Sequence, residues 1–188
     1  MVFLPRTDLA AQERCRCIVE AEILNFGYTI YGWRQVPVNV AVIGEKANAN
    51  RPEIEQIMIA NSRGLDEKAF ERDLYIIRRR IEKAARAESI KDLYICSLSC
   101  RSIIYKGMFL AEQLTAFYPD LGDRRFESNF AIFHQRYSTN TFPAWHLAQP
   151  FRVLAHNGEI NTLLGNVNWM RSHETRMAHD ALGEYMED

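Results

Sequence analysis

A long helical pattern between Leu65 and about Ala87 restricts the folds open to this chain. Its apolar residues recur every three or four positions, and the opposite face carries the run "RRR" and several acids. The apolar positions are Phe70, Leu74, Ile77, Ile81 and Ala84. This spacing predicts an amphipathic helix that covers an apolar surface and turns its charges to solvent.

Segments rich in aromatic and β-branched residues lie on both sides of this helix. We expect strands at 1–5, 28–39, 53–62, 130–138 and 151–156, and a β-hairpin that joins 93–99 to 102–108 near Cys100 and Arg101. We expect helices at 8–24, capped by Thr7 or Asp8, at 111–118 before Pro119, and after a cap at Asn161 or Thr162. The stretch 44–52 is predicted as a loop or one helical turn. Strands flanked by helices indicate a layered α/β or α+β domain.

Composition excludes several classes of partner. The 188 residues are 47% hydrophobic, enough for one sizeable core but not for three or four domains. A net charge of -1 gives no global positive field for nucleic acid or an anionic membrane. The apolar runs are too short to span a bilayer, and the start "MVFLPRTD" lacks the pattern of a signal peptide. We therefore expect a cytoplasmic protein that binds neither nucleic acid nor membrane.

The four cysteines, Cys15, Cys17, Cys96 and Cys100, form two close pairs that superficially resemble zinc spacing. Cys15 and Cys17 fall in the expected helix, where residues two apart point about 200° away from each other and cannot share one ion. A disulfide framework is not expected in a reducing compartment. We therefore predict structural or unreactive thiols and no metal site.

Polar residues are concentrated in "HQRYSTN", at the end of the expected strand 130–138. Arg136 suits the capture of a carboxylate because its planar guanidinium donates two parallel hydrogen bonds. Ser138 and Thr139 add donors and acceptors beside it. The alternative is that Arg136 pairs with an acid on the protein surface.

A second polar set, "HNGE", begins at His156. Asn-Gly between apolar segments often marks a hairpin, but here a helix pattern follows instead of a partner strand. The other interpretation is an oxyanion hole, in which the Asn157 side-chain amide and the Gly158 backbone N–H point at an oxygen that becomes negative during acyl transfer. Glycine suits this position because no side chain blocks close approach.

These stretches carry a family resemblance. The chain resembles an internal piece of the class II glutamine amidotransferase domain of glutamate synthase large subunits, through "GWRQVPVN", "SLSCRSIIYKGM", "RFESNFAIFHQRYSTNTFPAW", "QPFRVLAHNGEINTLLGN" and "NWMR". The combination of "HQRYSTNTFPAW" with "AHNGEIN" is highly specific, whereas a bare "NG" is not. The resemblance implies an α+β fold, part of the four-layer αββα sandwich of N-terminal-nucleophile hydrolases with two antiparallel sheets.

The resemblance also implies roles for single residues. Arg136 matches the arginine that holds the α-carboxylate of glutamine, Ser138 and Thr139 match substrate-lining positions, and Asn157 with Gly158 match the oxyanion hole. The family nucleophile is a cysteine with a free α-amine at the mature N-terminus, and this chain begins Met1-Val2. We therefore expect residues 1–188 to be part of one such domain, without its nucleophile segment and its C-terminal part, and to be inactive alone.

For the complete enzyme the resemblance implies glutamine hydrolysis to glutamate and ammonia, which then serves the reductive amination of 2-oxoglutarate. It implies FMN and an iron-sulfur cluster outside this chain, NADPH or ferredoxin as electron donor, and as partners the rest of the large subunit and a small NADPH-oxidising subunit. The alternative is a short non-catalytic protein, derived from that domain, that binds a ligand or a partner.

Overall fold

The structure, a computed structural model, describes residues 1–137, 142–151 and 163–187. The chain divides into two compact units, Met1–Val153 and Leu154–Asp188, which we describe separately. In the described part of the second unit, α5 spans Leu163–Glu174 and a 3-10 turn, η5, spans Gly183–Glu187. All the strands of the described residues belong to the first unit.

The first unit is built on one antiparallel sheet with the strand order β2-β3-β1-β4. The strands are β1 (Val2–Leu4), β2 (Thr29–Gln35), β3 (Glu53–Ala60) and β4 (Tyr94–Ile95). The short β1 lies in the middle, with Phe3 opposite Ile54 of β3 on one side and opposite Tyr94 of β4 on the other. An α+β fold with a small antiparallel sheet is therefore present, as predicted.

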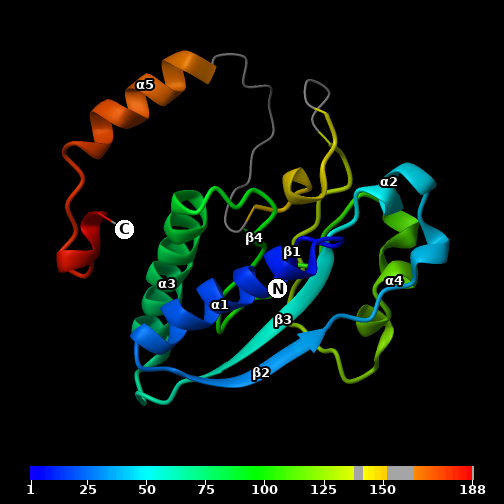
Figure 1. Cartoon of the computed structure of the whole chain (residues 1–188), viewed down its shortest axis with the longest axis horizontal. Helices are drawn as coiled ribbons and strands as arrows, with labels where there is room; N and C mark the ends of the chain where they lie inside the picture. The colour runs from blue at the N-terminus through cyan, green and yellow to red at the C-terminus, as the bar shows by residue number, and fades with distance from the viewer. Residues whose placement is uncertain (138–141, 152–162, 188) are drawn as a thin grey trace. The chain divides into compact units, whose positions relative to one another are not determined.

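Two long helices cover one face of this sheet (Figure 1). They are α1 (Leu9–Asn25) and α3 (Glu67–Ala87). Each begins at a capping aspartate: Asp8 accepts a hydrogen bond from the backbone N–H of Ala11 at 2.9 Å, and Asp66 accepts one from Ala69 at 2.8 Å. The caps explain where the apolar helical patterns begin.

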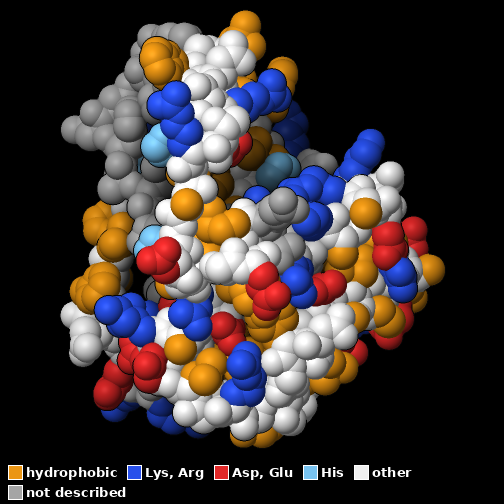
Figure 2. Space-filling view, turned by 90° about the vertical axis from the view of Figure 1, so that its left-hand side faces the viewer, with side chains coloured by type: hydrophobic (Ala, Val, Ile, Leu, Met, Phe, Trp, Pro, Cys, Tyr) orange, Lys and Arg blue, Asp and Glu red, His pale blue; other side chains and the backbone are white. Residues whose placement is uncertain are grey.

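The core between helices and sheet contains the residues that the helical pattern selected. Phe70, Leu74, Ile77 and Ile81 of α3 pack with Val2 and Leu4 of β1 and with Cys15, Ile18, Val19 and Ile23 of α1. The predicted amphipathic helix and its buried apolar face are thus confirmed. The prediction that its charges face solvent is wrong for Asp73 and Arg78, which are each only 5% exposed. In Figure 2, basic and acidic side chains are interspersed over the lower half of the face shown, as expected for a surface without one dominant sign of charge.

Short and irregular segments cover the opposite face of the sheet. The helical ones are η1 (Val40–Val42), α2 (Glu45–Ala49), η2 (Ala111–Gln113), α4 (Leu114–Phe117), η3 (Pro119–Gly122) and η4 (Trp145–Leu147). Their apolar residues form a second core with Phe3 and Ile54, whose largest members include Phe117, Tyr118 and Trp145. The predicted helical turn at 44–52 and the predicted short helix before Pro119 are both present.

The prediction of a hairpin between 93–99 and 102–108 is wrong. Within these two segments only Tyr94 and Ile95 form a strand, β4, and it pairs with β1 rather than with the following segment. The chain at 99–102 instead folds around the Ser99 hydroxyl, which accepts hydrogen bonds from the backbone N–H groups of Arg101 and Ser102. Residues 102–108 then run on without strand pairing.

The predicted strand at 130–138 is also not formed in its described part, 130–137. Phe130, Ile132 and Phe133 are exposed there, and none of the four described strands pairs with this stretch. A strand requires backbone partners, so the apolar pattern alone does not make one. Of the predicted strand 151–156 only Phe151 is described, and it is not in a strand; the predicted caps Asn161 and Thr162 lie outside the described residues.

No helix in the described parts of the chain combines the length and the apolar character needed to cross a membrane.

Substitution of Ile77 tests the helix-covered core. Ile77 is fully buried, so Ile77→Ala should lower the free energy of unfolding by about 2–5 kcal/mol through lost burial and the cavity left behind. Leu24→Ala is the control, because Leu24 of α1 is exposed, and it should change stability by no more than about 0.5 kcal/mol. Urea unfolding followed by circular dichroism measures both, and equal losses would contradict this description of the core.

Candidate functional site

Arg136 is the one described residue of the predicted site. Its side chain is exposed and lines a cavity of about 230 Å³ with apolar walls from Phe109, Leu114 and Phe133. No acidic group of the described residues forms an ion pair with it. The planar guanidinium can donate two parallel hydrogen bonds to a carboxylate or a phosphate.

Ser138, Thr139, Asn157 and Gly158 lie outside the described residues. The structure therefore does not test whether these four come together with Arg136. It does describe residues 142–151, which lie between the two predicted site segments in sequence.

Residues 144–151, which we call the anchored loop, are attached to the rest of the first unit by a buried tryptophan. Trp145 is 4% exposed and packs among Phe3, Phe109 and Phe117. Its indole N–H donates a hydrogen bond to the Ala47 carbonyl in α2 at 2.9 Å. A large apolar ring with its polar atom satisfied is a strong anchor, because moving it would expose the ring and break the hydrogen bond.

Gly107 provides the space in which Trp145 packs. A Cβ atom placed on Gly107 would lie 2.4 Å from Cζ3 of Trp145 and 2.6 Å from Cε1 of Phe109. Both distances are far inside van der Waals contact, so the tryptophan fits against this backbone only because glycine has no side chain. The glycine of "YKGM" therefore has a packing role.

Lys106, the residue before Gly107, is buried in the same region. It is 3% exposed, and its ammonium donates hydrogen bonds to the His146 and Ala148 carbonyls at 2.9 Å each and to the Tyr94 hydroxyl at 3.1 Å. Burial lowers the pKa of Lys106 to about 8, so it is mostly protonated at neutral pH. Burial, followed by the nearby Lys106 charge, also lowers the pKa of His146.

Tyr137 ties the end of the Arg136 segment to the same structure. Its hydroxyl lies 3.3 Å from both the Gly107 carbonyl and the Ala144 carbonyl, to either of which it can donate. Burial raises the pKa of Tyr137 to about 12, so the hydroxyl remains a donor at neutral pH. The anchored loop is thus held to the residues beside Arg136.

Sequence reasoning did not identify Lys106, Gly107, Tyr137 or Trp145 as parts of this region. A lysine inside the apolar run "SIIYKGM" was the available signal, because a charge in such a run is costly unless it is satisfied. We expected a strand at 102–108, in which alternate side chains reach solvent, so the lysine was not expected to be buried.

The four cysteines lie in different surroundings. Cys15 and Cys96 are buried, Cys17 and Cys100 are exposed, and all four are free. Burial is the largest cause that raises the thiol pKa of Cys15 to about 11 and of Cys96 to about 12. No group of three or more His, Cys, Asp or Glu side chains within the described residues could hold a metal ion.

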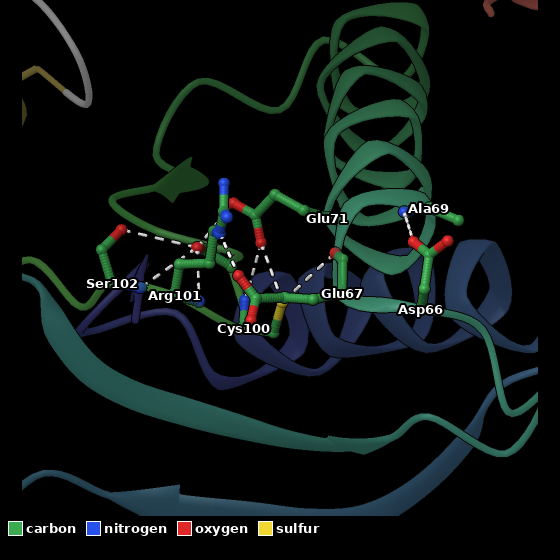
Figure 3. Close-up of polar contacts among 8 residues, drawn as sticks. Asp66, Glu67, Ala69, Glu71, Cys100, Arg101 and Ser102 are labelled. Atoms are coloured by element: carbon green, nitrogen blue, oxygen red, sulfur yellow. Dashed lines mark hydrogen bonds and ion pairs between the residues drawn. The ribbon is translucent and has the colours of Figure 1, made fainter.

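Cys100 lies beside acidic side chains of α3 (Figure 3). Its thiol is 3.2 Å from a carboxylate oxygen of Glu71, which also accepts the Cys100 backbone N–H at 2.9 Å, and Arg101 pairs with Glu67. Partial burial and the Glu71 carboxylate raise the pKa of Cys100 to about 11. A thiol held protonated in this way is a poor nucleophile.

Comparison with known proteins gives consistent family matches. The family described as class-II glutamine amidotransferases matches residues 1–188. The chain is 75% identical over 187 residues to a glutamate synthase [NADPH] large chain of Azospirillum brasilense, covering 100% of this chain and 12% of that protein.

Two further relatives agree. A chloroplastic ferredoxin-dependent glutamate synthase of Spinacia oleracea is 49% identical, over 93% of this chain and 11% of its own length. A glutamate synthase [NADPH] large chain of Bacillus subtilis (strain 168) is 46% identical, over 92% of this chain and 11% of its own length. The chain thus spans about an eighth or less of each of these relatives.

Gly107→Ala tests the close packing of the anchored loop. The added methyl group would clash with Trp145, so the free energy of unfolding should fall by about 1–3 kcal/mol. The emission of Trp145, isolated by Trp33→Phe and Trp169→Phe, should shift to longer wavelength as the ring loses its buried position. Gly122→Ala is the matched control because a Cβ there meets nothing within 4 Å. An unchanged emission spectrum in Gly107→Ala would show that the packing is wrong.

Proposed function

This chain belongs to the class II glutamine amidotransferases, and from that premise we propose that it forms part of the glutamine-hydrolysing site of a glutamate synthase large chain. The complete site would hydrolyse the side-chain amide of glutamine to give glutamate and ammonia. The observation that carries the proposal is the occurrence of "HQRYSTNTFPAW" and "AHNGEIN" in a chain that the family matches over its whole length.

In this proposal Arg136 recognises the α-carboxylate of glutamine. Its exposed guanidinium at the wall of a cavity, without an ion-pair partner among the described residues, supports that assignment. A fixed fork of donors would orient the substrate so that its side-chain amide faces the catalytic groups. Ser138 and Thr139 would line the substrate next to this clamp.

Asn157 and Gly158 would form the oxyanion hole. When a nucleophile adds to the amide carbon, the carbonyl oxygen becomes negative, and the Asn157 side-chain N–H and the Gly158 backbone N–H would donate hydrogen bonds to it. These bonds strengthen as charge develops, so they lower the barrier more than they tighten substrate binding.

The nucleophile is proposed to come from the polypeptide outside residues 1–188. Of the four cysteines in this chain, Cys15 and Cys96 are buried, and Cys100 has a raised pKa. Cys17 lies within α1 and has no free α-amine to serve as its base. Residues 1–188 alone would then bind or orient glutamine without cleaving it.

We further propose that the complete domain is the four-layer αββα sandwich of the N-terminal-nucleophile hydrolases. The sheet described above, with α1 and α3 on one face, would supply one sheet and one helical layer. The exposed apolar residues Phe130, Ile132 and Phe133 would gain strand partners in the complete domain.

The rest of the large chain would use the released ammonia to aminate 2-oxoglutarate. Where NADPH is the electron donor, a small subunit would oxidise it. FMN would supply the reducing electrons and an iron-sulfur cluster would carry them. The described residues of this chain do not fit an iron-sulfur cluster, because no group of three or more of their Cys, His, Asp or Glu side chains lies close enough together to hold a metal ion. No step of amide hydrolysis by this chain is therefore routed through these groups.

Arg136→Lys in the full-length enzyme tests the carboxylate clamp. A lysine ammonium cannot reproduce two parallel hydrogen bonds, so the KM for glutamine should rise on the order of tenfold, since a hydrogen bond to a charged group contributes roughly 1.5–3 kcal/mol. Steady-state ammonia release measures it. Arg125→Lys serves as control because Arg125 is highly exposed and pairs with Asp123. Unchanged glutamine kinetics in Arg136→Lys would remove this residue from the site.

Asn157→Ala tests the oxyanion hole. Loss of one donor should lower kcat for glutamine hydrolysis on the order of 10²-fold or more, while glutamate formation from added ammonia should be largely retained because it bypasses amide cleavage. The exposed Asn129 provides a control, Asn129→Ala. Parallel loss of both activities would indicate misfolding and would count against the assigned role.

A further inference from the structure

A cavity of about 780 Å³ in the first unit shares no lining residue with the cavity beside Arg136. Its wall includes Arg6, which follows β1, Arg51, which follows α2, and Lys91, which follows α3. Trp145 of the anchored loop lines another part of the wall. A cavity of this size lies within the range of those that bind small organic ligands, about 300–1,000 Å³.

The guanidinium groups of Arg6 and Arg51 are both bonded to Asn48. Nη1 of Arg6 donates to the Asn48 carbonyl at 2.7 Å, and Nε of Arg51 donates to the Asn48 side-chain oxygen at 3.4 Å. Nη1 of Arg51 also donates to the Pro52 carbonyl at 3.2 Å. Within residues 1–137 and 142–151, no protein acceptor bonds to Nη2 of either arginine. Two positive groups are therefore held near each other with N–H donors still unused.

No acid neutralises these two arginines. Among the described residues, no carboxylate forms an ion pair with Arg6, Arg51 or Lys91. Asp8 and Asp92 also line the cavity, and Asp8 is engaged as the cap of α1. Burial, followed by the charge of Arg6, lowers the pKa of Arg51. Like charges near each other have this effect, and an anion bound between them would remove their repulsion.

A phosphate group fits these donors better than a carboxylate does. A carboxylate has two oxygens, and one guanidinium can bind both through parallel hydrogen bonds. A phosphate monoester has three terminal oxygens and a charge of about -1.5 to -2 at neutral pH, so it can accept hydrogen bonds from two guanidinium groups and neutralise both. The rings of Tyr94 and Trp145 in the same wall suit an apolar group attached to the phosphate.

We propose that Arg6 and Arg51 form a phosphate-binding site, and that Lys91 adds to its positive charge. The ligand is either free phosphate or the phosphate group of a small organic ester. This site is separate from the proposed glutamine site, and it neither requires nor tests amide hydrolysis.

The first test uses the wild-type 188-residue chain in a phosphate-free buffer of low ionic strength. Phenylglyoxal modifies arginine side chains, and mass spectrometry of the peptides gives the rate at each arginine. Added inorganic phosphate should slow the modification of Arg6 and Arg51 several-fold, with the same half-saturating concentration for both. Arg125 is the internal control, because its side chain is 89% exposed, and its rate should not change. No residue is substituted, so a local structural defect does not enter. Unprotected Arg6 and Arg51 would overturn the proposal.

Other anions identify the ligand in the same assay. Acetate at equal concentration and ionic strength should protect Arg6 and Arg51 much less than phosphate does, and equal protection by acetate would refute a phosphate site. Phenyl phosphate separates the two sources of the phosphate group. Protection at a lower concentration than inorganic phosphate requires would indicate an organic ester, and protection at the same concentration would indicate free phosphate.

Arg51→Gln separates ligand binding from a structural role. In phosphate-free buffer its melting temperature, followed by circular dichroism, should equal or exceed that of wild type, because a partly buried charge and its repulsion with Arg6 are removed. A structural defect would change the melting temperature in the opposite direction. The phosphate concentration that half-protects Arg6 should rise at least about tenfold, as expected for the loss of hydrogen bonds to a charged ligand.

Arg125→Gln is the matched control and should bind phosphate as wild type does. A lower melting temperature of Arg51→Gln, with unchanged protection of Arg6 by phosphate, would show that Arg51 serves only the fold and would overturn the proposal. If Arg51→Gln does not fold, the protection of Arg6 and Arg51 in the wild-type chain still decides the matter.

Discussion

The pairing of β1 with both β3 and β4 is the interaction on which the rest of the structure depends. This three-residue strand lies in the middle of the sheet, and its side chains alternate between two cores. Val2 and Leu4 point to the core under α1 and α3, while Phe3 points to the core that holds Trp145. Because strand side chains alternate with period two, a shift of one residue would exchange these faces and disrupt both cores.

The two faces of the sheet have different roles. The helix-covered face packs against α1 and α3 in an apolar core. The periodic apolar residues of the two helices and their capping aspartates stabilise this part of the fold. The opposite face is covered by irregular segments that are joined through polar contacts as well as packing. The buried Lys106 and the close approach of Trp145 to Gly107 fix the anchored loop there. Arg136, the one described residue of the predicted site, lines a cavity with Phe109 and Leu114, which pack against this second core.

The sequence predicted the parts of the fold that depend on local patterns. The helix over Ile77 and the strands around Ile54 follow from periodicity, and Asp8 follows from capping preferences. The wrong hairpin at 93–108 shows the limit of such reasoning. An apolar run indicates that its residues are buried, but it does not indicate which strand they pair with. Strand pairing depends on the whole sheet, and β4 pairs with β1, about ninety residues away in sequence.

The residues of the candidate site also divide into those that the local sequence identifies and those that it does not. Arg136 was chosen from the sequence because guanidinium chemistry and a specific motif agree, and its role remains a prediction, as do those of Ser138, Thr139, Asn157 and Gly158. Lys106 and Gly107 could not be chosen, because their importance arises from groups that meet only in three dimensions. A lysine gains its role from two loop carbonyls roughly forty residues further along the chain.

The most direct test of the central claim is a crystal structure of the full-length enzyme with an unreactive glutamine analogue bound. The account predicts that Arg136 donates two hydrogen bonds to the α-carboxylate and that Asn157 and Gly158 lie against the side-chain carbonyl oxygen, at hydrogen-bonding distances of about 2.7–3.2 Å. An analogue bound away from these residues, with Arg136 paired to an acid of the protein, would contradict it.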